Sequence, residues 1–537
     1  MTASRRDFLS ALAATAVAPA LASLATTSAA AQAGGPTRLP LQDFVKNAKL
    51  VESLRRGVQV MRSRPPSDPR SWIFQGAVHA INDRLLADIL LSDPKVALVD
   101  QEKFWNRCPH SGQNSAEFTI WHRAYLYYFE RILRDAAQDP DLALPFWDYN
   151  NPNAETIEPS TRLFPQQFAN QFLDPPTNRQ PNPLYHPNRE QAFTSGRFLL
   201  SPLAVDIRDT MAQKSFFGAT EAEGFAGGVA DNDAGTQGFV ERRPHNQIHF
   251  AVGGVIGEVA GAMADVPTAA FDPIFWVHHS NIDRLWVEWA CSRDKDWGAL
   301  PSRDWFEARP WFFHDFDLSV KNEQRLHYVQ HRNLGIRYQG EDPSCVPLQL
   351  PPYIVGPVVA AAAARVRPFA TTEALRVDAG VQASALQPAT FVIGGSALAR
   401  LDQTVRTTVQ GASLRQGDQK ILLEVQELTF DRPPSAGFDL YANLAPGETP
   451  SRQSAKFIGT LALFGLGQQK DTAHAHAHGG GQLFDISSIF ASGGAPSELT
   501  IHVVPFDLLT PRGNTAPLRR PDAIRIKGFR IVTMSRL

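Results

Sequence analysis

Two adjacent histidines, His278 and His279, lie inside a long apolar helical segment, and this feature constrains the fold more than any other. Asp272 and Pro273 predict where the helix begins, because Asp is a favoured N-cap and Pro is favoured at the first helical position. Asp283 comes four residues after His279, so the two side chains share one face of the helix. Asp283 could orient the ring of His279 or brace a neighbouring turn, as carboxylates near metal ligands do.

Further histidines occur in two other helical segments. His245 and His249 are four residues apart, a spacing that lets two imidazoles on one helix face converge on a metal ion. His327 and His331 have the same spacing, so the spacing alone is weak evidence. His122 lies in an aromatic helical segment, where a single histidine is ordinarily part of the core. The occurrence of all these segments in one chain therefore indicates a metal site better than any one of them.

Together these segments resemble the type-3 copper family of tyrosinases, catechol oxidases and hemocyanins. The stretch from Trp121 to Glu130 is similar to the first copper signature of that family, and the stretch from Asp272 to Asp283 is similar to the second. Neutral imidazoles suit copper in both oxidation states and leave positions open for O2. The resemblance implies two copper ions per chain, one held by His79, His110 and His122 and the other by His245, His249 and His279, with His278 and Asp283 beside the ligands.

The region before His122 departs from the family pattern. Eleven residues separate His110 from His122, which is more than is usual in the family, and an insertion at 111–117 is expected. Cys108 lies two residues before His110. In several type-3 copper proteins a cysteine at this place is joined to the histidine ring by a thioether. A thioether between Cys108 and His110 is therefore expected, and a buried free thiol is the alternative.

Resemblance to the plant-type enzymes implies roles for three more residues. Glu241 and Asn246 match a Glu that holds a water molecule and an Asn that orients it, an arrangement that would help a phenol lose its proton near copper. Alternatively, Glu241 pairs with a neighbouring arginine and Asn246 caps a helix. Val266, thirteen residues before His279, stands where those enzymes often have a bulky Phe over the first copper. A wider entrance for the substrate is therefore expected.

Helical and strand signals divide the chain into two halves. Apolar residues at helical spacing occur in segments 72–91, 118–137 and 271–290, whereas short β-branched runs occur at 390–393, 420–428, 457–463, 499–504 and 523–533. We expect a mainly α catalytic domain, in which a helix bundle holds the dicopper site, followed by an antiparallel β-sandwich. The expected boundaries are 1–31 for a signal peptide, 32–342 for the catalytic domain, 343–385 for a Pro/Ala-rich linker and 386–537 for the sandwich. The sandwich resembles the C-terminal domain of plant polyphenol oxidases, which can cover the copper site as a lid.

The N-terminal residues resemble a twin-arginine signal peptide. Arg5 and Arg6 precede an Ala-rich apolar run and small residues at 28–31. Export to the periplasm or the medium in the folded state is therefore expected, and an ordinary N-terminal helix is the alternative. No later segment has the ~18 apolar residues of a membrane helix. Lys and Arg number 52 against 54 Asp and Glu, so the charge gives no reason to expect a nucleic acid partner.

The predicted function is the copper-dependent oxidation of monophenols and o-diphenols to o-quinones, with a small phenol and O2 as partners. Reversible O2 binding, as in hemocyanin, would use the same six histidines and is the alternative. The sequence shows no repeated oxygen-binding units, which argues against O2 carriage. The sequence leaves open the natural phenol, the ratio of the two activities, activation by cleavage, the oligomeric state, the pairing of Cys291 with Cys345, and the role of His474, His476 and His478.

Overall fold

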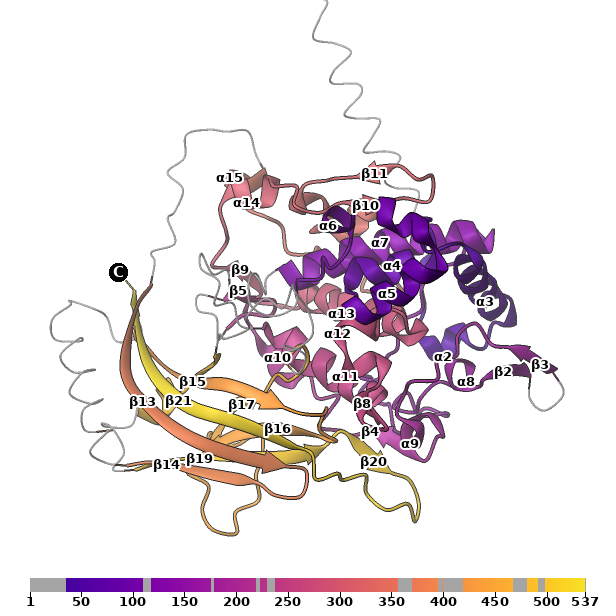
Figure 1. Ribbon diagram of the computed structural model, residues 1–537. Helices are drawn as coiled ribbons and strands as arrows, with labels where there is room; N and C mark the ends of the chain where they lie inside the picture. The colour runs from indigo at the N-terminus through magenta and orange to yellow at the C-terminus, as the bar shows by residue number, and fades with distance from the viewer. Residues whose placement is uncertain are drawn as a thin grey trace, which may run out of the picture.

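The computed structural model describes residues 35–109, 117–174, 178–218, 223–228, 237–355, 369–394, 398, 419–466, 481–490 and 498–536. Figure 1 shows a helical part, built from residues 35–355, beside a β-sandwich built from residues 369–536, which we call the β-domain. The expected fold class, a helical domain followed by an antiparallel sandwich, is confirmed. The predicted signal peptide, His110, and the histidines at 474, 476 and 478 lie outside the described residues.

Four helices of the helical part carry the predicted histidines. They are α4 (Trp72–His79), α7 (Glu117–Ala137), α11 (Asn246–Gly253) and α13 (Pro273–Cys291). Helix α7 is buried along almost its whole length and packs against α13 and α3 (Ala48–Ser63). A helix that is apolar on most faces belongs in the interior, so the aromatic composition of α7 explains its central place.

Short elements surround these helices. Among the described residues no helix combines the length and the apolar character needed to cross a membrane. The short helices and turns are α2 (Leu41–Phe44), α5 (Asp83–Ser92), η1 (Pro94–Leu98), α6 (Gln101–Phe104), α8 (Gln166–Ala169), α9 (Gln191–Thr194), α10 (Arg208–Ala212), η2 (Glu241–His245), η3 (Ala262–Ala264), α12 (Val266–Ala269), α14 (Arg303–Glu307), η4 (Arg325–Tyr328), η5 (His331–Leu334) and α15 (Pro352–Val355). The short strands are β2 (Phe172–Asp174), β3 (Asn178–Pro181), β5 (Ser215–Gly218), β6 (Gly227–Gly228), β7 (Val255–Ile256), β8 (Val259–Ala260), β9 (Asp296–Gly298), β10 (Phe313–His314) and β11 (Val320–Lys321).

The helix starts follow local capping. Helix α13 begins as predicted, because the Asp272 carboxylate accepts a hydrogen bond from the Ile274 amide at 3.0 Å. Segment 72–91, for which helical spacing was predicted, divides into α4 and α5. Ala80 is extended, with φ −164° and ψ 156°, and Asn82 caps α5. The break places His79 at the end of its helix, where the ring faces the interior.

Asp283 joins residues near the start and near the end of the helical part to its central helices. Its carboxylate pairs with Arg123 of α7 at 2.6 Å and with Arg38 at 3.3 Å, and it accepts a hydrogen bond from the Tyr338 hydroxyl at 2.5 Å. Arg38 and Tyr338 belong to the parallel pair of β1 (Thr37–Arg38) and β12 (Arg337–Tyr338). The expectation that Asp283 orients the ring of His279 is corrected, because its carboxylate is held by these groups and braces α7 instead.

A disulfide fastens the end of the helical part. Cys291, the last residue of α13, is bonded to Cys345, and their Cα atoms are 5.4 Å apart. Leu350 and Ile354 are buried in the same core. Residues 369–384, which were assigned to the linker, form strand β13 (Phe369–Ser384). The predicted linker of 343–385 is therefore too long at both ends, because its first part packs on the helical part and its last part joins the sandwich.

The β-domain consists of two four-stranded antiparallel sheets. The first has the order β13, β21 (Ala523–Arg536), β15 (Gln419–Phe430) and β18 (Gln482–Asp485), and the second has the order β14 (Ala389–Ile393), β19 (Leu499–Asp507), β16 (Ala436–Ala442) and β17 (Phe457–Thr460). Phe391 of β14 stacks on Phe529 of β21 between the sheets. Helix α17 (Ser487–Phe490) lies beside β15.

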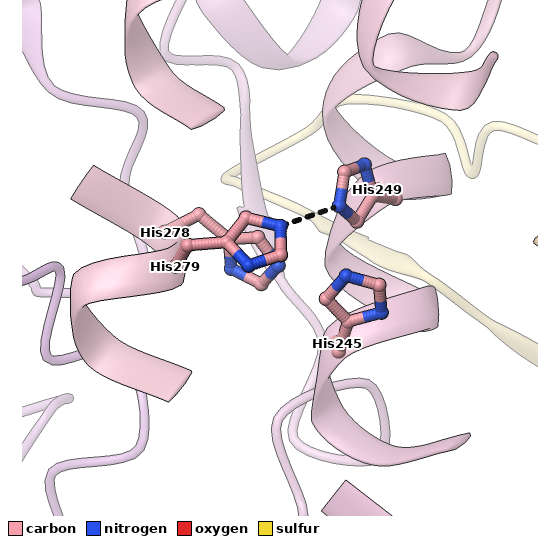
Figure 2. Close-up of side chains that lie close together, drawn as sticks. All are labelled: His245, His249, His278 and His279. Atoms are coloured by element: carbon pink, nitrogen blue, oxygen red, sulfur yellow. Dashed lines mark hydrogen bonds between the residues drawn. The ribbon is translucent and has the colours of Figure 1, made fainter. Parts of the chain in front are cut away.

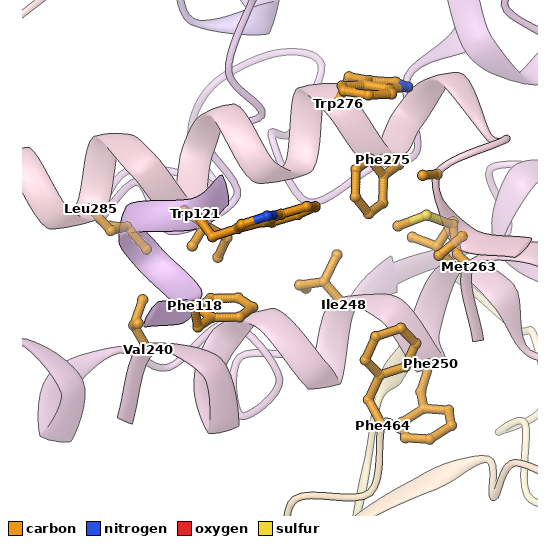
Figure 3. Packing of buried hydrophobic residues seen from close by; sticks show 14 of the residues in the cluster. Phe118, Trp121, Val240, Ile248, Phe250, Met263, Phe275, Trp276, Leu285 and Phe464 are labelled. Atoms are coloured by element: carbon orange, nitrogen blue, oxygen red, sulfur yellow. The ribbon is translucent and has the colours of Figure 1, made fainter. Parts of the chain in front are cut away.

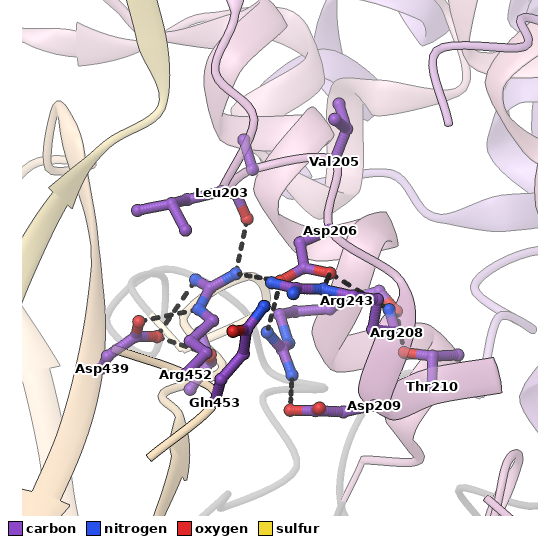
Figure 4. Close-up of polar contacts among 12 residues, drawn as sticks. Leu203, Val205, Asp206, Arg208, Asp209, Thr210, Arg243, Asp439, Arg452 and Gln453 are labelled. Carbon is purple, nitrogen blue, oxygen red and sulfur yellow. Dashed lines mark hydrogen bonds and ion pairs between the residues drawn. The ribbon is translucent and has the colours of Figure 1, made fainter. Parts of the chain in front are cut away.

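A strand pair and a cluster of side-chain ion pairs hold the β-domain against the helical part. Strand β20 (Leu509–Pro511) pairs with β4 (Phe198–Leu200) of the helical part. Figure 4 shows Arg452, which is held by Asp439 of its own domain at 2.8 Å and donates a hydrogen bond to the Leu203 carbonyl at 2.7 Å. Asp206 lies 3.6 Å from Arg452 and 4.0 Å from Arg243. This ion cluster ends two residues before His245, so the domain contact reaches the region of the histidines.

Candidate metal centre

Two groups of side chains, on the four helices and just outside them, could hold metal. The first group consists of His79, Cys108 and His122, and the second consists of His245, His249, His278 and His279. Within each group the candidate ligand atoms lie within 4.8 Å of one another. Figure 2 shows the second group, in which rings from α11 and its start face rings from α13. The structure thus brings together five of the six predicted ligands, and His110 lies outside the described residues.

The rings of His245 and His249 lie close together, as their four-residue spacing predicts, although His245 precedes α11. The segment η2 is kinked at Arg243, which is extended with φ −148° and ψ 128°. His245 itself already has helical dihedral angles, with φ −49° and ψ −61°. Its ring therefore lies one helical turn from that of His249, with 4.4 Å between the ring centroids.

Three of the rings are oriented by main-chain carbonyls. A carbonyl oxygen can only accept, so the Nδ1 atom that faces it must carry the proton. The Nε2 atom then keeps its lone pair, which is the form that binds metal. The carbonyls are those of Val266 for His79 at 3.2 Å, Phe118 for His122 at 2.8 Å and Met263 for His249 at 2.7 Å.

His279 belongs to the second group and lies where that group adjoins the first. Its Nε2 atom is 3.4 Å from Nε2 of His249, and its ring stacks on His122 with centroids 4.3 Å apart. His278 points to the other side of the group, where it stacks on His245 at 5.3 Å and its Nδ1 atom is hydrogen bonded to the Tyr149 hydroxyl at 2.9 Å. Burial lowers the pKa of both His278 and His279 well below the ordinary value. Both rings are therefore neutral, as metal ligands must be.

The donor set fits copper. His79, His245, His249 and His279 are fully buried and His122 is nearly so, and all five are imidazoles that the sequence predicts as ligands. Neither group contains a carboxylate, which hard cations would require, and imidazole suits copper. Aromatic rings close the walls, because Phe275 lies 4.1 Å from His279 and Phe118 lies 4.4 Å from His122 between centroids. The centre is therefore a buried pair of adjoining sites lined by imidazole and aromatic rings.

Cys108 lies at the edge of the first group. Its Sγ atom is 3.5 Å from Nε2 of His122, and its amide donates a hydrogen bond to the His79 carbonyl at 3.2 Å. Burial, together with the nearby charge of Glu241, raises the pKa of the Cys108 thiol well above its ordinary value. The thioether to His110 stays a prediction, because that histidine lies outside the described residues.

The residues expected to tune the reaction lie close to these groups. Glu241 and Asn246 are fully buried. Burial lowers the pKa of Arg242 to about 10, and the charge of the neighbouring Glu241 acts against this. The Asn246 carboxamide is hydrogen bonded to Nδ1 of His245 at 2.9 Å. Val266 begins α12 and is half-buried, with its carbonyl on His79.

One residue at the centre was missed by the sequence analysis. Phe464, which follows strand β17 in the β-domain, is fully buried and stacks on the ring of His249 with centroids 4.0 Å apart. It also meets the ring of His245 edge-on at 5.7 Å. Figure 3 shows this ring beside Phe250 of α11, where the two parts of the chain meet. No local pattern around Phe464 signals this contact, because its partners are about 215 residues away in the sequence.

Two protein families match this chain. The first, described as the common central domain of tyrosinase, matches residues 69–291, which include all the described candidate ligands. The second, described as a domain of unknown function, matches residues 370–507 of the β-domain.

Individual relatives extend the match beyond the central domain. The chain is 28% identical over 455 residues to a tyrosinase of Hahella sp. (strain CCB-MM4), covering 80% of this chain and 86% of that protein. It is 24% identical over 436 residues to a chloroplastic polyphenol oxidase of Malus domestica, covering 79% of this chain and 66% of that one. The solved structure of latent apple tyrosinase shares the fold over 94% of this chain and 98% of its own, with a TM-score of 0.56 and 21% identity. Both the helical part and the β-domain therefore have counterparts of the same fold.

Proposed function

Because the chain belongs to the tyrosinase and polyphenol oxidase family of type-3 copper oxidoreductases, we propose that it oxidises monophenols and o-diphenols to o-quinones. We further propose that His79, His110 and His122 hold one copper ion and that His245, His249 and His279 hold the other. The observation that carries this proposal is the meeting of two buried imidazole groups at His279. Two bound copper ions would supply the coupled reduction of O2 and oxidation of the phenol ring.

The protein side chains would bind and orient the substrate. The aromatic walls formed by Phe118 and Phe275 exclude water, and an aromatic ring can pack against a phenol. We assign to Val266 the role of a small residue at the entrance, since it is half-buried beside His79. His278 keeps a place beside the ligands, because Tyr149 and His245 already contact it.

Glu241 and Asn246 would serve the monophenol reaction. A monophenol has to lose its hydroxyl proton, and a buried carboxylate beside a fixed carboxamide can hold the water molecule that takes it. The full burial of both residues next to His245 supports this role. Replacing Glu241 with Gln should lower tyrosine hydroxylation more than catechol oxidation at unchanged copper content. An equal loss on both substrates would assign Glu241 to structure.

The proposed activity is tested with copper-loaded full-length protein in air. Tyrosine, a simpler monophenol and catechol are compared side by side, with quinone absorbance and O2 consumption as the measurements. We expect quinone from catechol and, after hydroxylation, from the monophenols. Reversible O2 uptake without quinone from any substrate would instead support the oxygen-carrier alternative.

Export by the twin-arginine route is also a proposal. The paired arginines and the apolar run of residues 1–31 support it, and the family's need for copper suits a protein that folds before export. Replacing Arg5 and Arg6 with Lys should retain the protein inside the cell in a fractionation experiment. Unchanged export of this variant would contradict the proposal.

A further inference from the structure

We propose that Gln237 is a positioning residue through which the β-domain orients His245 for copper. The inference rests on the proposed function but concerns the assembly of the metal site, not the oxidation itself. It is carried by a chain of three hydrogen bonds that runs from the main chain of Phe464, through Gln237 and Asn246, to the ring of His245.

This series of hydrogen bonds is continuous and buried. Nε2 of Gln237 donates to the main-chain carbonyl of Phe464 at 3.3 Å. Nδ2 of Asn246 donates to Oε1 of Gln237 at 2.5 Å, and Oδ1 of Asn246 is hydrogen bonded to Nδ1 of His245 at 2.9 Å. Gln237 is 6% exposed, and Asn246 and His245 are fully buried. Water therefore does not compete readily for these bonds, and each one constrains the next.

The carbonyl of Phe464 determines the direction of every bond in the chain. A carbonyl only accepts, so Gln237 must turn its amide nitrogen to Phe464 and its oxygen to Asn246. Asn246 must then turn its nitrogen to Gln237 and its oxygen to His245. An acceptor at that point requires the proton on Nδ1 of His245, which leaves the lone pair on Nε2 for the metal. Reversed carboxamides would present a donor to Nδ1 and move the proton to Nε2, which could not then bind copper.

The β-domain also holds the main chain at Gln237. Nε of Arg242 donates to the Gln237 carbonyl at 2.7 Å. The same guanidinium donates to the Leu483 carbonyl of the β-domain at 3.4 Å and lies over the Phe484 ring at 5.2 Å. The β-domain thus holds the side chain of Gln237 directly, through the Phe464 carbonyl, and its main chain indirectly, through Arg242.

His245 differs in this respect from the other oriented rings. His79, His122 and His249 donate to carbonyls that belong to the helical part. Among the predicted ligands that the structure describes, the one oriented through the β-domain belongs to the second copper ion. This gives the inference a specific signature, which is a selective loss of affinity at the second site.

The test measures copper binding to metal-free, full-length protein by competition with a chelator. Gln237→Met keeps the volume of the side chain but removes both hydrogen bonds. We expect the copper ion of the second group to bind about 10–100-fold more weakly, the usual effect of removing a group that orients a ligand. The copper ion of the first group should bind as in the wild type. Gln75→Met is the matched control, because Gln75 is also buried and donates to a main-chain carbonyl, that of Pro69, away from His245.

Two more variants test the separate members of this series of hydrogen bonds. Phe464→Ala removes the ring but keeps the carbonyl, so the second copper ion should bind more tightly to it than to Gln237→Met. Gln237→Glu keeps an acceptor for Asn246, so its affinity at the second site should exceed that of Gln237→Met. Wild-type affinity at both sites in Gln237→Met would overturn the inference, as would equal weakness of Gln237→Glu and Gln237→Met. Failure of the wild type to bind two copper ions would instead contradict the proposed function.

Discussion

Apart from His279, each histidine ring in the two groups is oriented by the atom that its Nδ1 contacts, and this decides how a substitution acts. His279 has no hydrogen-bond partner at Nδ1 within the described part of the chain, and its Nε2 atom faces His249. Its position is therefore fixed by ring packing against Phe275 and His122. His279 is held by ring packing where the two groups adjoin. Its replacement should therefore most directly separate an effect on metal binding from an effect on folding.

We expect His279→Ala to abolish catechol oxidation and to lower copper from about two ions per chain toward one. The reason is that the variant removes one of the three imidazoles of the second site. Copper per chain is measured by elemental analysis and activity by quinone absorbance. His327→Ala is the control, because His327 is exposed, whereas His331 is buried against Glu341 and would disturb an ion pair. Full copper in His279→Ala would contradict the ligand assignment.

The thioether hypothesis for Cys108 gives a second prediction. Cys291 and Cys345 form a disulfide, so Cys108 is the cysteine left over. If Cys108 is joined to His110, the copper-loaded chain with its disulfide reduced should be lighter than its sequence mass by one pair of hydrogen atoms. The single peptide that contains both residues should keep this mass deficit under reduction. Complete alkylation of Cys108 in unfolded, reduced protein would rule the link out.

The start of helix α13 combines a cap with an ion pair, and the two can be separated. Asp272 accepts from the Ile274 amide and pairs with Arg189 at 2.6 Å, and both side chains are buried. Asp272→Asn keeps a good N-cap but leaves the Arg189 charge without its partner. The free energy of unfolding should fall by about 3–5 kcal/mol, as for other broken buried pairs. Glu288→Gln on the same helix breaks only a surface pair with Arg284 and should cost at most about 1 kcal/mol.

The same pair predicts a dependence on pH. Burial raises the pKa of Asp272, but the charge and hydrogen bonds of Arg189 outweigh it, and the net pKa is lowered. A carboxyl with a lowered pKa in the folded state stabilises the fold above its unfolded pKa of about 3.9. Its contribution should be lost as the pH falls from there through the folded pKa. Denaturant titrations of wild type and Asp272→Asn should therefore converge at low pH.

Local patterns predict some elements and not others. Asp272 and Pro273 locate the start of α13 because capping depends on neighbouring residues only. The break between α4 and α5 was not predicted, because apolar spacing continues across Ala80 although the chain there is extended. Strand β13 was assigned to the linker, because its pairing with β21 is formed by residues more than 130 positions away. Contacts of that range leave no local signal.

In the candidate site too, local patterns predict some features, whereas others depend on contacts between distant parts of the sequence. Helical spacing places His245 and His249 on one face, but the choice of His245, His249 and His279 as ligands came from the resemblance to the type-3 copper family. The sequence left two roles open for Asp283, orienting His279 or bracing a neighbouring turn, and could not choose between them, because its partners Arg123 and Arg38 come from other helices and strands. Phe464 could not be predicted at all, because only the docking of the β-domain brings it to His249.

The docked β-domain should restrain the enzyme through Phe464. Its ring covers His249 and His245 from the side of the β-domain, so a substrate that approaches there must displace it. Phe464→Ala should raise the turnover of bulky phenols more than that of catechol, since a cover excludes by size. Phe391→Ala, within the sandwich and stacked on Phe529, is the control for loss of a β-domain ring. Equal turnover in Phe464→Ala and wild type would show that the ring does not limit access.

Removal of the β-domain should have opposite effects on activity and on copper uptake, so the order of the two steps matters. A cut at 356–368, in the predicted linker but outside the described residues, would keep Cys345 and its disulfide, whereas a chain ending at Asp342 would lose them. Protein loaded with copper, then cut and separated by mild detergent, should gain activity because Phe464 leaves His249. Protein cut and separated first should take up the second copper ion more weakly, because Gln237 has lost the Phe464 carbonyl. Equal final activity and copper content in the two orders would show that the β-domain only covers the site. Aggregation in both orders would show that the helical part needs the β-domain to bury its apolar surface.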